Sequence, residues 1–156
     1  MTVVRWLLLG FVVAPLLSAC GSKPPPPTVV QLTVKAAPDI NPDAENRPSP
    51  VVLRAYQLAA TDSFDKADFF QLYDKDAATL GADMADRQEI AVAPGETKTV
   101  TIEFKPNAKF LGIIGAFRSI DRAAWRANAP VPANKTTSLT ATVDALSVKL
   151  VPGGSQ

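Results

Sequence analysis

The 156-residue chain contains no histidine and a single cysteine, Cys20. Without histidine it has no Ser-His or Cys-His pair of nucleophile and base, and no histidine-based zinc site. One cysteine cannot close a disulfide within the chain, and no second thiol is present for metal or redox chemistry. These absences exclude most hydrolase mechanisms and leave the role of Cys20 to be inferred from its neighbours.

The chain also lacks an excess of charge of either sign, since it contains 16 Lys and Arg residues and 15 Asp and Glu residues. This balance provides no basic surplus for binding nucleic acid. The acidic stretch at residues 74–76 lacks the glycine and the glutamate that an EF-hand calcium loop requires at fixed spacing. Asp62, Asp65 and Asp68 recur every three residues, which fits a solvated helix face better than the carboxylate pair of a glycosidase. We therefore expect no enzyme, no cofactor, no metal site and no nucleic-acid partner.

The longest apolar run lies at the N-terminus. It extends from Trp6 to Leu17, follows a short start that carries the positive charge of Arg5, and ends at two small residues. A membrane-spanning helix needs about 20 apolar residues, so this shorter run is typical of a secretory signal peptide. We assign residues 1–19 to that signal peptide.

The four residues Leu17, Ser18, Ala19 and Cys20 resemble the lipobox of bacterial lipoproteins. The resemblance implies that the Cys20 sulfur receives diacylglycerol, that the chain is cut before Cys20, and that several acyl chains hold the mature protein in a membrane. Gly21 stands where lipoproteins retained in the inner membrane have an aspartate. We therefore expect a lipid anchor in the outer membrane, with the protein facing the periplasm.

Four prolines at residues 24–27 follow the lipobox. Their fixed φ angles favour an extended polyproline segment that rises about 3.1 Å per residue. They act either as a stiff spacer or as a generic disordered linker, and in both cases residues 20–28 form a tether. The remaining length suits one folded domain at residues 29–152, with a short tail at residues 153–156.

Alternating apolar and polar residues predict strands throughout this domain. The clearest period of two lies at residues 99–105. Residues 110–117 read FLGIIGAF, which is apolar on both faces, as expected of a central strand that is covered on both sides. The other predicted strands are residues 30–36, 51–59 and 88–92, followed by one or two strands within residues 139–150.

The C-terminal stretch changes phase near Asp144, because its apolar residues lie at odd positions up to Val143 and at even positions from Leu146. A hairpin with Asp144 and Ala145 as a two-residue loop would place Val143 opposite Leu146 and keep one face apolar. Primed hairpin turns favour glycine at the second loop position, so one long strand with a β-bulge stays open as the alternative.

An insert at about residues 61–86 lacks strand alternation. It places Phe64, Phe69 and Leu72 among acids and lysines behind the candidate N-cap residues Thr61 and Ser63, which predicts one or two short helices. We interpret the aromatic residues as closing the end of the sandwich rather than as forming a ligand pocket. The whole pattern predicts a mainly β fold, an antiparallel two-sheet β-sandwich of seven or eight strands with a short helical insert.

A long polar loop separates the first two predicted strands. It contains prolines at positions 38, 42, 48 and 50, and loops of this length are usually functional or disordered. The prolines restrict the backbone and so reduce the entropy lost when a partner orders the loop. Arg47 is the best charged candidate for a contact, because no periodicity directs it inward. The candidate partner-binding residues are Asp39, Ile40, Asn41, Pro42, Asp43, Glu45, Asn46, Arg47 and Pro48.

Several segments resemble the TssJ family, the outer-membrane lipoproteins of bacterial type VI secretion. They are, in order behind the lipobox, NPDAENRPSPVVLRAYQL, DSFDKADFFQLYDKDAATLGADM, the APGE turn and IIGAFRSIDRAAWR. The resemblance implies a transthyretin-like sandwich in a multimeric trans-envelope complex, whose loop at residues 38–49 holds the periplasmic C-terminal domain of the inner-membrane protein TssM. The chain departs from the family at Asn46 and Ala145, where members often have glycine.

A function of another class is also open, namely a lipid-anchored periplasmic module that binds a glycan or a small ligand in its end loops. Stacking aromatics and clustered amides would favour it, but the long loops offer only Trp125 and scattered asparagines. A chaperone that uses an open strand edge is a third interpretation.

Overall fold

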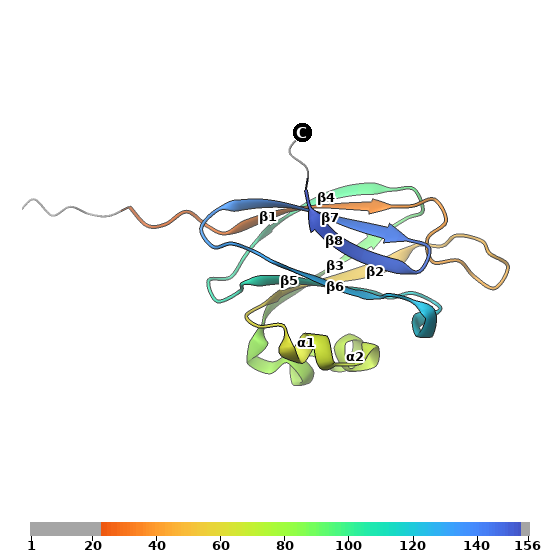
Figure 1. The fold of residues 1–156 in the computed structure, drawn as a ribbon, viewed down its shortest axis with the longest axis horizontal. Helices are drawn as coiled ribbons and strands as arrows, with labels where there is room; N and C mark the ends of the chain where they lie inside the picture. The colour runs from red at the N-terminus through yellow and green to blue at the C-terminus, as the bar shows by residue number, and fades with distance from the viewer. Residues whose placement is uncertain (1–22, 154–156) are drawn as a thin grey trace, which may run out of the picture.

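The computed structural model describes residues 23–153, which form two four-stranded sheets packed face to face (Figure 1). The strand order is β4-β1-β7-β8 in the first sheet and β3-β2-β5-β6 in the second. The predicted β-sandwich is confirmed, with one pairing, β1 with β7, parallel and the others antiparallel. The strands are β1 (Val29–Ala36), β2 (Val51–Leu58), β3 (Met84–Val92), β4 (Thr97–Glu103), β5 (Phe110–Gly115), β6 (Arg126–Pro130), β7 (Thr136–Asp144) and β8 (Ser147–Pro152).

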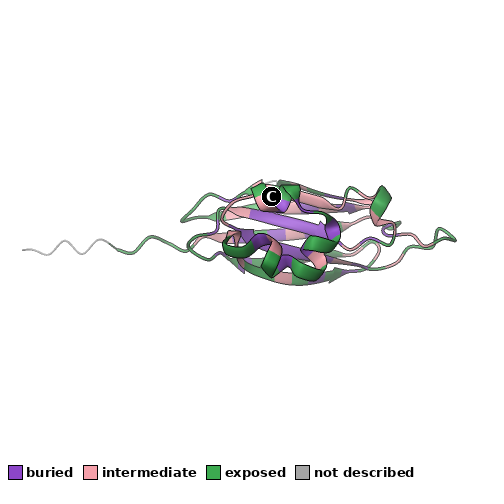
Figure 2. Cartoon of the chain, turned by 90° about the horizontal axis from the view of Figure 1, so that it is seen from below, coloured by how far each residue is buried: buried purple, intermediate pink, exposed green. Residues whose placement is uncertain are grey.

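A helical layer lies against the outer face of the second sheet (Figures 1 and 2). It consists of α1 (Asp62–Lys66), α2 (Phe69–Leu80) and the 3-10 turn η1 (Gly81–Asp83), and a further 3-10 turn, η2 (Ile120–Arg122), precedes β6. A capping box of Asp68 and Gln71 starts α2 and satisfies two backbone N–H groups. Within the described residues, no helix has the length and apolar character needed to cross a membrane.

Two apolar clusters follow from this layering. The main core fills the space between the sheets, and a second cluster lies between the helices and the second sheet. β5 contributes to both, since Leu111 and Ile113 belong to the main core and Ile114 to the second cluster. Gly112 faces the helices so closely that an added Cβ would lie 2.8 Å from Leu58 Cδ1. The expectation of a central strand covered on both faces is confirmed.

The C-terminal strands form a hairpin, which decides between the two predicted alternatives. Its loop consists of Ala145 and Leu146, and Val143 pairs with Val148. The predicted loop of Asp144 and Ala145 was therefore displaced by one residue. Asp144 instead ends β7 and accepts a hydrogen bond from the Ser147 hydroxyl at 3.1 Å, which closes the turn. Both registers keep the same apolar face, so the hydrophobic pattern alone could not distinguish them.

Two strand assignments differ from the sequence pattern. β6 has the sequence RANAP, which does not alternate clearly, and it was not predicted. It pairs with β5 at the end of the second sheet. β3 begins at Met84, so residues 84–86 belong to this strand and not to the helical insert. Residues 86–89 of β3 are polar and, apart from half-buried Gln88, exposed, since β3 is the other outermost strand of that sheet.

Candidate partner-binding site

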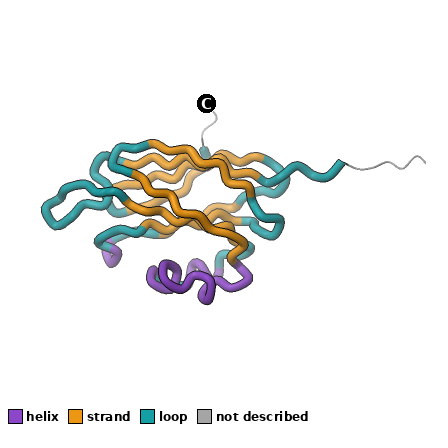
Figure 3. Tube along the Cα trace, turned by 180° about the vertical axis from the view of Figure 1, so that it is seen from behind, coloured by secondary structure: helices purple, strands orange, loops and turns teal. Residues whose placement is uncertain are grey.

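The predicted loop lies at the opposite end of the sandwich from the point where the described chain enters it. Residues 23–28 approach the first sheet at one end, and β1 carries the chain to the other end, where residues 37–50 project beyond the strands (Figures 1 and 3). The turns after β3, β5 and β7 lie at the same end as the loop. The predicted signal peptide and Cys20 fall outside the described residues.

Asn41 fixes the base of the loop. Its backbone N–H donates to the Ala145 carbonyl at 2.8 Å, and its side-chain amide donates to the Pro50 carbonyl at 2.8 Å. Its side-chain oxygen accepts the Arg118 N–H at 2.7 Å, and its carbonyl accepts the Ser49 hydroxyl. Asn41 has a φ of 49°, a left-handed conformation that asparagine tolerates better than most residues. The outgoing and the returning segments of the loop are thus both held to the sandwich at Asn41.

Two of the candidate contact residues are interior. Ile40 has no exposed surface and packs in the main core, and Asn41 is only 3% exposed. Neither side chain offers a surface to a partner, so their assignment as contact residues is corrected to a role in holding the loop. Sequence reasoning placed them at the surface because a loop has no periodicity that separates inward from outward positions.

Asp43 organises the tip of the loop. Its Oδ1 accepts the backbone N–H groups of Glu45 at 3.0 Å and of Arg47 at 2.9 Å. Its Oδ2 accepts Arg47 Nε at 2.8 Å, while Arg47 Nη2 reaches Glu45 Oε2 at 3.0 Å. Asn46 takes a φ of 61°, which lets the chain reverse between these partners. The tip is therefore a small structured unit held by its own hydrogen bonds.

The electrostatics of the tip follow from these bonds. The Arg47 backbone N–H, with further contributions from the Arg47 side chain and the Glu45 N–H, holds the pKa of the Asp43 carboxyl below its ordinary value of 3.8. Arg47, the charged candidate for a contact, is paired within the tip while its side chain stays 73% exposed. The other candidates are Pro42, which is half-buried, and the exposed residues Asp39, Glu45, Asn46 and Pro48.

Arg118 supports the loop from a distant part of the sequence. Besides its N–H bond to Asn41, its Nε donates to the Ser49 hydroxyl at 3.0 Å. This contact joins residues 69 positions apart in the sequence, and no sequence pattern predicted it. Arg126 contacts the helical layer instead, because its Nη1 donates to the carbonyls of Phe64 at 2.7 Å and Ala67 at 2.8 Å.

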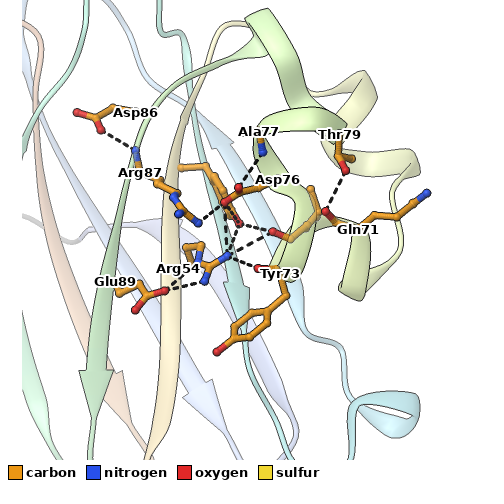
Figure 4. Close-up of polar contacts among 11 residues, drawn as sticks. Arg54, Gln71, Tyr73, Asp76, Ala77, Thr79, Asp86, Arg87 and Glu89 are labelled. Carbon is orange, nitrogen blue, oxygen red and sulfur yellow. Dashed lines mark hydrogen bonds and ion pairs between the residues drawn. The ribbon is translucent and has the colours of Figure 1, made fainter.

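A buried polar cluster fastens the helical layer to the second sheet (Figure 4). Arg54 on β2 is 7% exposed, and its Nη1 donates to the Tyr73 carbonyl at 2.7 Å. Its Nη2 donates to Glu89 Oε1 at 2.7 Å, and its guanidinium lies 4.5 Å from the centre of the Tyr73 ring. Asp76, also buried, accepts from Arg54 and Arg87. The sequence signal was an arginine within the apolar strand VVLRAYQL, and it was missed.

The cluster coincides with a break in α2. Lys75 has a non-helical backbone, and the carbonyls of Leu72 and Tyr73 before the break point toward β2. Tyr56 donates its hydroxyl to the Leu72 carbonyl at 2.9 Å, and burial raises the pKa of that hydroxyl. Asp76 accepts the Ala77 N–H at 2.7 Å where the helix resumes. The cluster thus supplies hydrogen-bond partners for the backbone groups that the break in α2 leaves unpaired, and in this way it supports the fold.

Comparisons with known proteins place the chain in a family. Residues 28–146 match the family described as "Type VI secretion lipoprotein, VasD, EvfM, TssJ". No curated protein sequence matches the chain significantly.

Solved structures share the fold. The type VI secretion lipoprotein TssJ1 from Pseudomonas aeruginosa is 34% identical with a TM-score of 0.80, over 84% of this chain and 100% of that one. Serratia marcescens Lip, described as a membrane-bound component of the type VI secretion system, is 22% identical with a TM-score of 0.75, over 83% and 99% of the two chains. A chain in a structure described as "Type VI membrane complex" is 27% identical with a TM-score of 0.71, over 80% and 98%.

The family match extends from the last residue of the tether to the final hairpin, and it therefore covers the loop, its base at Asn41 and the helical layer. The match to TssJ1 adds the same arrangement in space over the whole of that protein. The chain belongs to the TssJ family of type VI secretion lipoproteins.

Proposed function

We propose that this protein is a non-enzymatic lipoprotein of the type VI secretion membrane complex, and that it anchors the periplasmic C-terminal domain of TssM through the loop at residues 38–49. The observation that carries the proposal is the loop itself. It has a firmly held base, a structured and exposed tip, and a position at the far end of the sandwich from the N-terminal tether. A preformed tip loses little conformational entropy when a partner binds.

The comparisons support this choice of partner. One matching structure is described as a type VI membrane complex, and another, 24% identical with a TM-score of 0.67, as the TssM C-terminal domain from EAEC. The chain covers 99% of the matched chain in the latter structure. These descriptions connect proteins of this fold with TssM, and we transfer that connection to this chain.

The membrane end of the proposal rests on the sequence. Acylation of Cys20 would hold the tether in the outer membrane, and residues 21–28 would connect it to β1. Because β1 runs away from the tether, the loop that follows it would face the periplasm. In this arrangement one short strand separates the anchor from the site that binds TssM.

Not all of the candidate loop residues serve this contact. With Ile40 and Asn41 in the interior, the proposed contact surface consists of Asp39, Pro42, Asp43, Glu45, Asn46, Arg47 and Pro48. The Arg47 side chain is 73% exposed, and arginines are enriched among residues that dominate binding energy.

Calorimetric titration tests the loop. Residues 23–156 are titrated with the periplasmic C-terminal fragment of TssM from the same organism, and we expect micromolar or tighter binding. The double variant Glu45→Ala/Arg47→Ala removes one acid and one base from the tip, so it should weaken binding about tenfold or more without changing net charge.

A charge-matched control is available at the other end of the sandwich. Asp86 and Lys105 form an exposed ion pair with 3.7 Å between Oδ2 and Nζ. The variant Asp86→Ala/Lys105→Ala should leave the affinity within about twofold, because exposed pairs contribute little. If the tip variant binds as tightly as the original, the loop is not the contact site. If the original protein gives no heat, the glycan or small-ligand alternative gains weight.

Fractionation of cells tests the anchor separately. The Cys20→Ser variant should move from the membrane fraction to the soluble periplasmic fraction, because it can no longer be acylated. Retention in the membrane fraction would contradict acylation of Cys20.

A further inference from the structure

We propose that the end of the sandwich beside the tether binds the anionic headgroup surface of the membrane that holds the acyl chains. The proposed surface consists of residues 23–28, 104–109 and 131–135, which we call the tether-end loops. This inference rests on the proposed anchoring through Cys20 and goes beyond it. The acyl chains would hold the protein in the bilayer, and the tether-end loops would set its orientation.

Hydrogen bonds gather these three segments at one place. The Thr28 carbonyl accepts the Phe104 N–H at 2.9 Å, and the Thr28 hydroxyl accepts the Asn134 N–H at 2.8 Å. The Lys109 carbonyl accepts the Val131 N–H at 2.7 Å. Figure 3 shows these loops at the end where the chain enters the first sheet. Residues far apart in sequence therefore form one continuous surface next to the tether.

The tether-end loops contain four lysines and no acidic residue. The lysines are Lys23, Lys105, Lys109 and Lys135, and all are exposed. Acids lie nearby as well. Glu103 ends β4, and Asp86 on β3 approaches Lys105 Nζ at 3.7 Å. Asp83 precedes β3 at the same end, where its carbonyl accepts the Ala59 N–H at 2.8 Å. Among residues 23–153, the other three lysines of the set have no acidic partner within 4.0 Å.

The charge of this end contrasts with the rest of the domain. Without residues 1–22, which contain Arg5, the chain has 15 basic and 15 acidic residues and no net charge. The loops at the opposite end, residues 37–50, 93–96, 116–125 and 145–146, carry five acids and three bases. Four lysines gathered at one end of a domain without net charge would turn that end toward an anionic membrane surface.

The length of the tether keeps this surface near the bilayer. Residues 20–28 in a polyproline conformation extend about 25 Å at about 3.1 Å per residue. Exposed charges act over about 8 Å at physiological salt, so a bent or tilted tether would bring the lysines within range of lipid phosphates. The ammonium group of lysine binds phosphate as a compact point charge. An anionic lipid surface therefore has the chemistry that this end can recognise.

Vesicle binding by the unacylated protein tests the proposal without involving Cys20 or TssM. Residues 23–156 contain both sheets and both apolar clusters, and folding is checked by circular dichroism. We expect sedimentation with vesicles of phosphatidylglycerol and phosphatidylcholine, and not with vesicles of phosphatidylcholine alone. Each lysine near an anionic surface contributes about a fivefold increase in binding, so Lys23→Gln/Lys109→Gln/Lys135→Gln should reduce binding about a hundredfold. Raising the salt concentration should weaken binding by the original protein.

A charge-matched variant separates the surface from overall charge. Lys35→Gln/Lys75→Gln/Lys149→Gln removes three exposed lysines outside the tether-end loops, and it should bind at least ten times more tightly than the first variant. Equal losses in both variants, or equal binding to neutral and anionic vesicles, would overturn the proposal. The proposal would also be overturned if anionic bicelles perturbed the NMR signals of residues 43–47 and not those of residues 104–109 and 131–135. Fractionation of Cys20→Ser and titration with TssM report on the proposed function independently of these results.

Discussion

Asn41 shows how a single residue can determine the shape of a loop. Its left-handed backbone turns the chain, and its side-chain amide joins the returning segment at Pro50 to the segment after β5 at Arg118. Asparagine is suited to both tasks, because it tolerates positive φ and carries a donor and an acceptor in one group. Asn46 shares the backbone conformation but lies exposed at the tip. Comparing Asn41 with Asn46 therefore separates the effect of tolerating a positive φ, which both share, from the effect of the side-chain hydrogen bonds, which Asn41 adds.

Replacing each of these asparagines by alanine should have unequal effects. Both variants lose a residue that tolerates positive φ, but only Asn41→Ala leaves the Pro50 carbonyl and the Arg118 N–H without their partner. We expect Asn41→Ala to lower the free energy of unfolding by about 2 kcal/mol more than Asn46→Ala does. Urea denaturation of both proteins measures the difference. Equal losses would mean that the amide bonds do not hold the loop.

The lowered pKa of Asp43 makes the tip sensitive to acid. A carboxyl whose folded pKa lies below its unfolded value stabilises the fold above the unfolded pKa, and the contribution is lost as the pH falls through the folded pKa. The tip should therefore keep its hydrogen bonds at pH 5 and above, and lose them only below about pH 4. Carboxyl carbon NMR of Asp43 follows this titration.

Arg47→Gln refines the prediction about Asp43. The largest cause of the shift, the backbone N–H of residue 47, is kept in this variant, and only the guanidinium is removed. The pKa of Asp43 should rise and stay below its ordinary value. A complete return to that value would assign the whole shift to the side chain.

Elements with a clear apolar period were the ones that the sequence predicted well. β4 and β5 follow from Val100, Ile102 and the run FLGIIGAF, since one or both faces of these strands are buried. β6 escaped prediction because an edge strand of five residues needs little apolar surface. The loop was predicted from its prolines, but its base was not, because Arg118 meets Asn41 across 77 residues of sequence.

The buried arginine of β2 should matter more than an exposed one. Arg54→Ala removes the donor that satisfies the Tyr73 carbonyl and leaves buried Asp76 with Arg87 as its remaining cationic partner. We expect a loss of about 3 kcal/mol in the free energy of unfolding. Faster hydrogen exchange should appear in α2, which the cluster holds to the sheet. Arg122→Ala, an exposed arginine in η2, is the control and should stay within about 0.5 kcal/mol of the original protein.

The whole domain should unfold in one step. The two apolar clusters share β2 and β5, because Leu53 and Leu111 face the main core while Tyr56 and Ile114 face the helices. Neither cluster can open without exposing a strand of the other. In residues 23–156 Trp125 is the only tryptophan, and it packs against Phe69 of α2 with ring centres 5.4 Å apart.

Two probes of unfolding can therefore be compared directly. Fluorescence of Trp125 reports on its contact with α2, and the NMR amide signals of β1 and β7 report on the first sheet. We expect the two urea transitions to coincide. An earlier fluorescence transition would show that the helical layer separates from a sandwich that is still folded.

The position of β1 determines how the molecule would respond to mechanical load. Residues 23–28 lead into one end of this strand and the loop leaves from the other. Under the proposed function, tension between an acylated N-terminus and a loop bound to TssM would therefore run along β1. β1 pairs with β4 on one side and with β7 on the other along nearly its whole length. Its hydrogen bonds lie across the direction of pull and would be strained together in shear, not broken one at a time as in unzipping. β1 therefore both connects the proposed anchor to the proposed binding loop and is the strand best placed to resist being pulled out of the sheet.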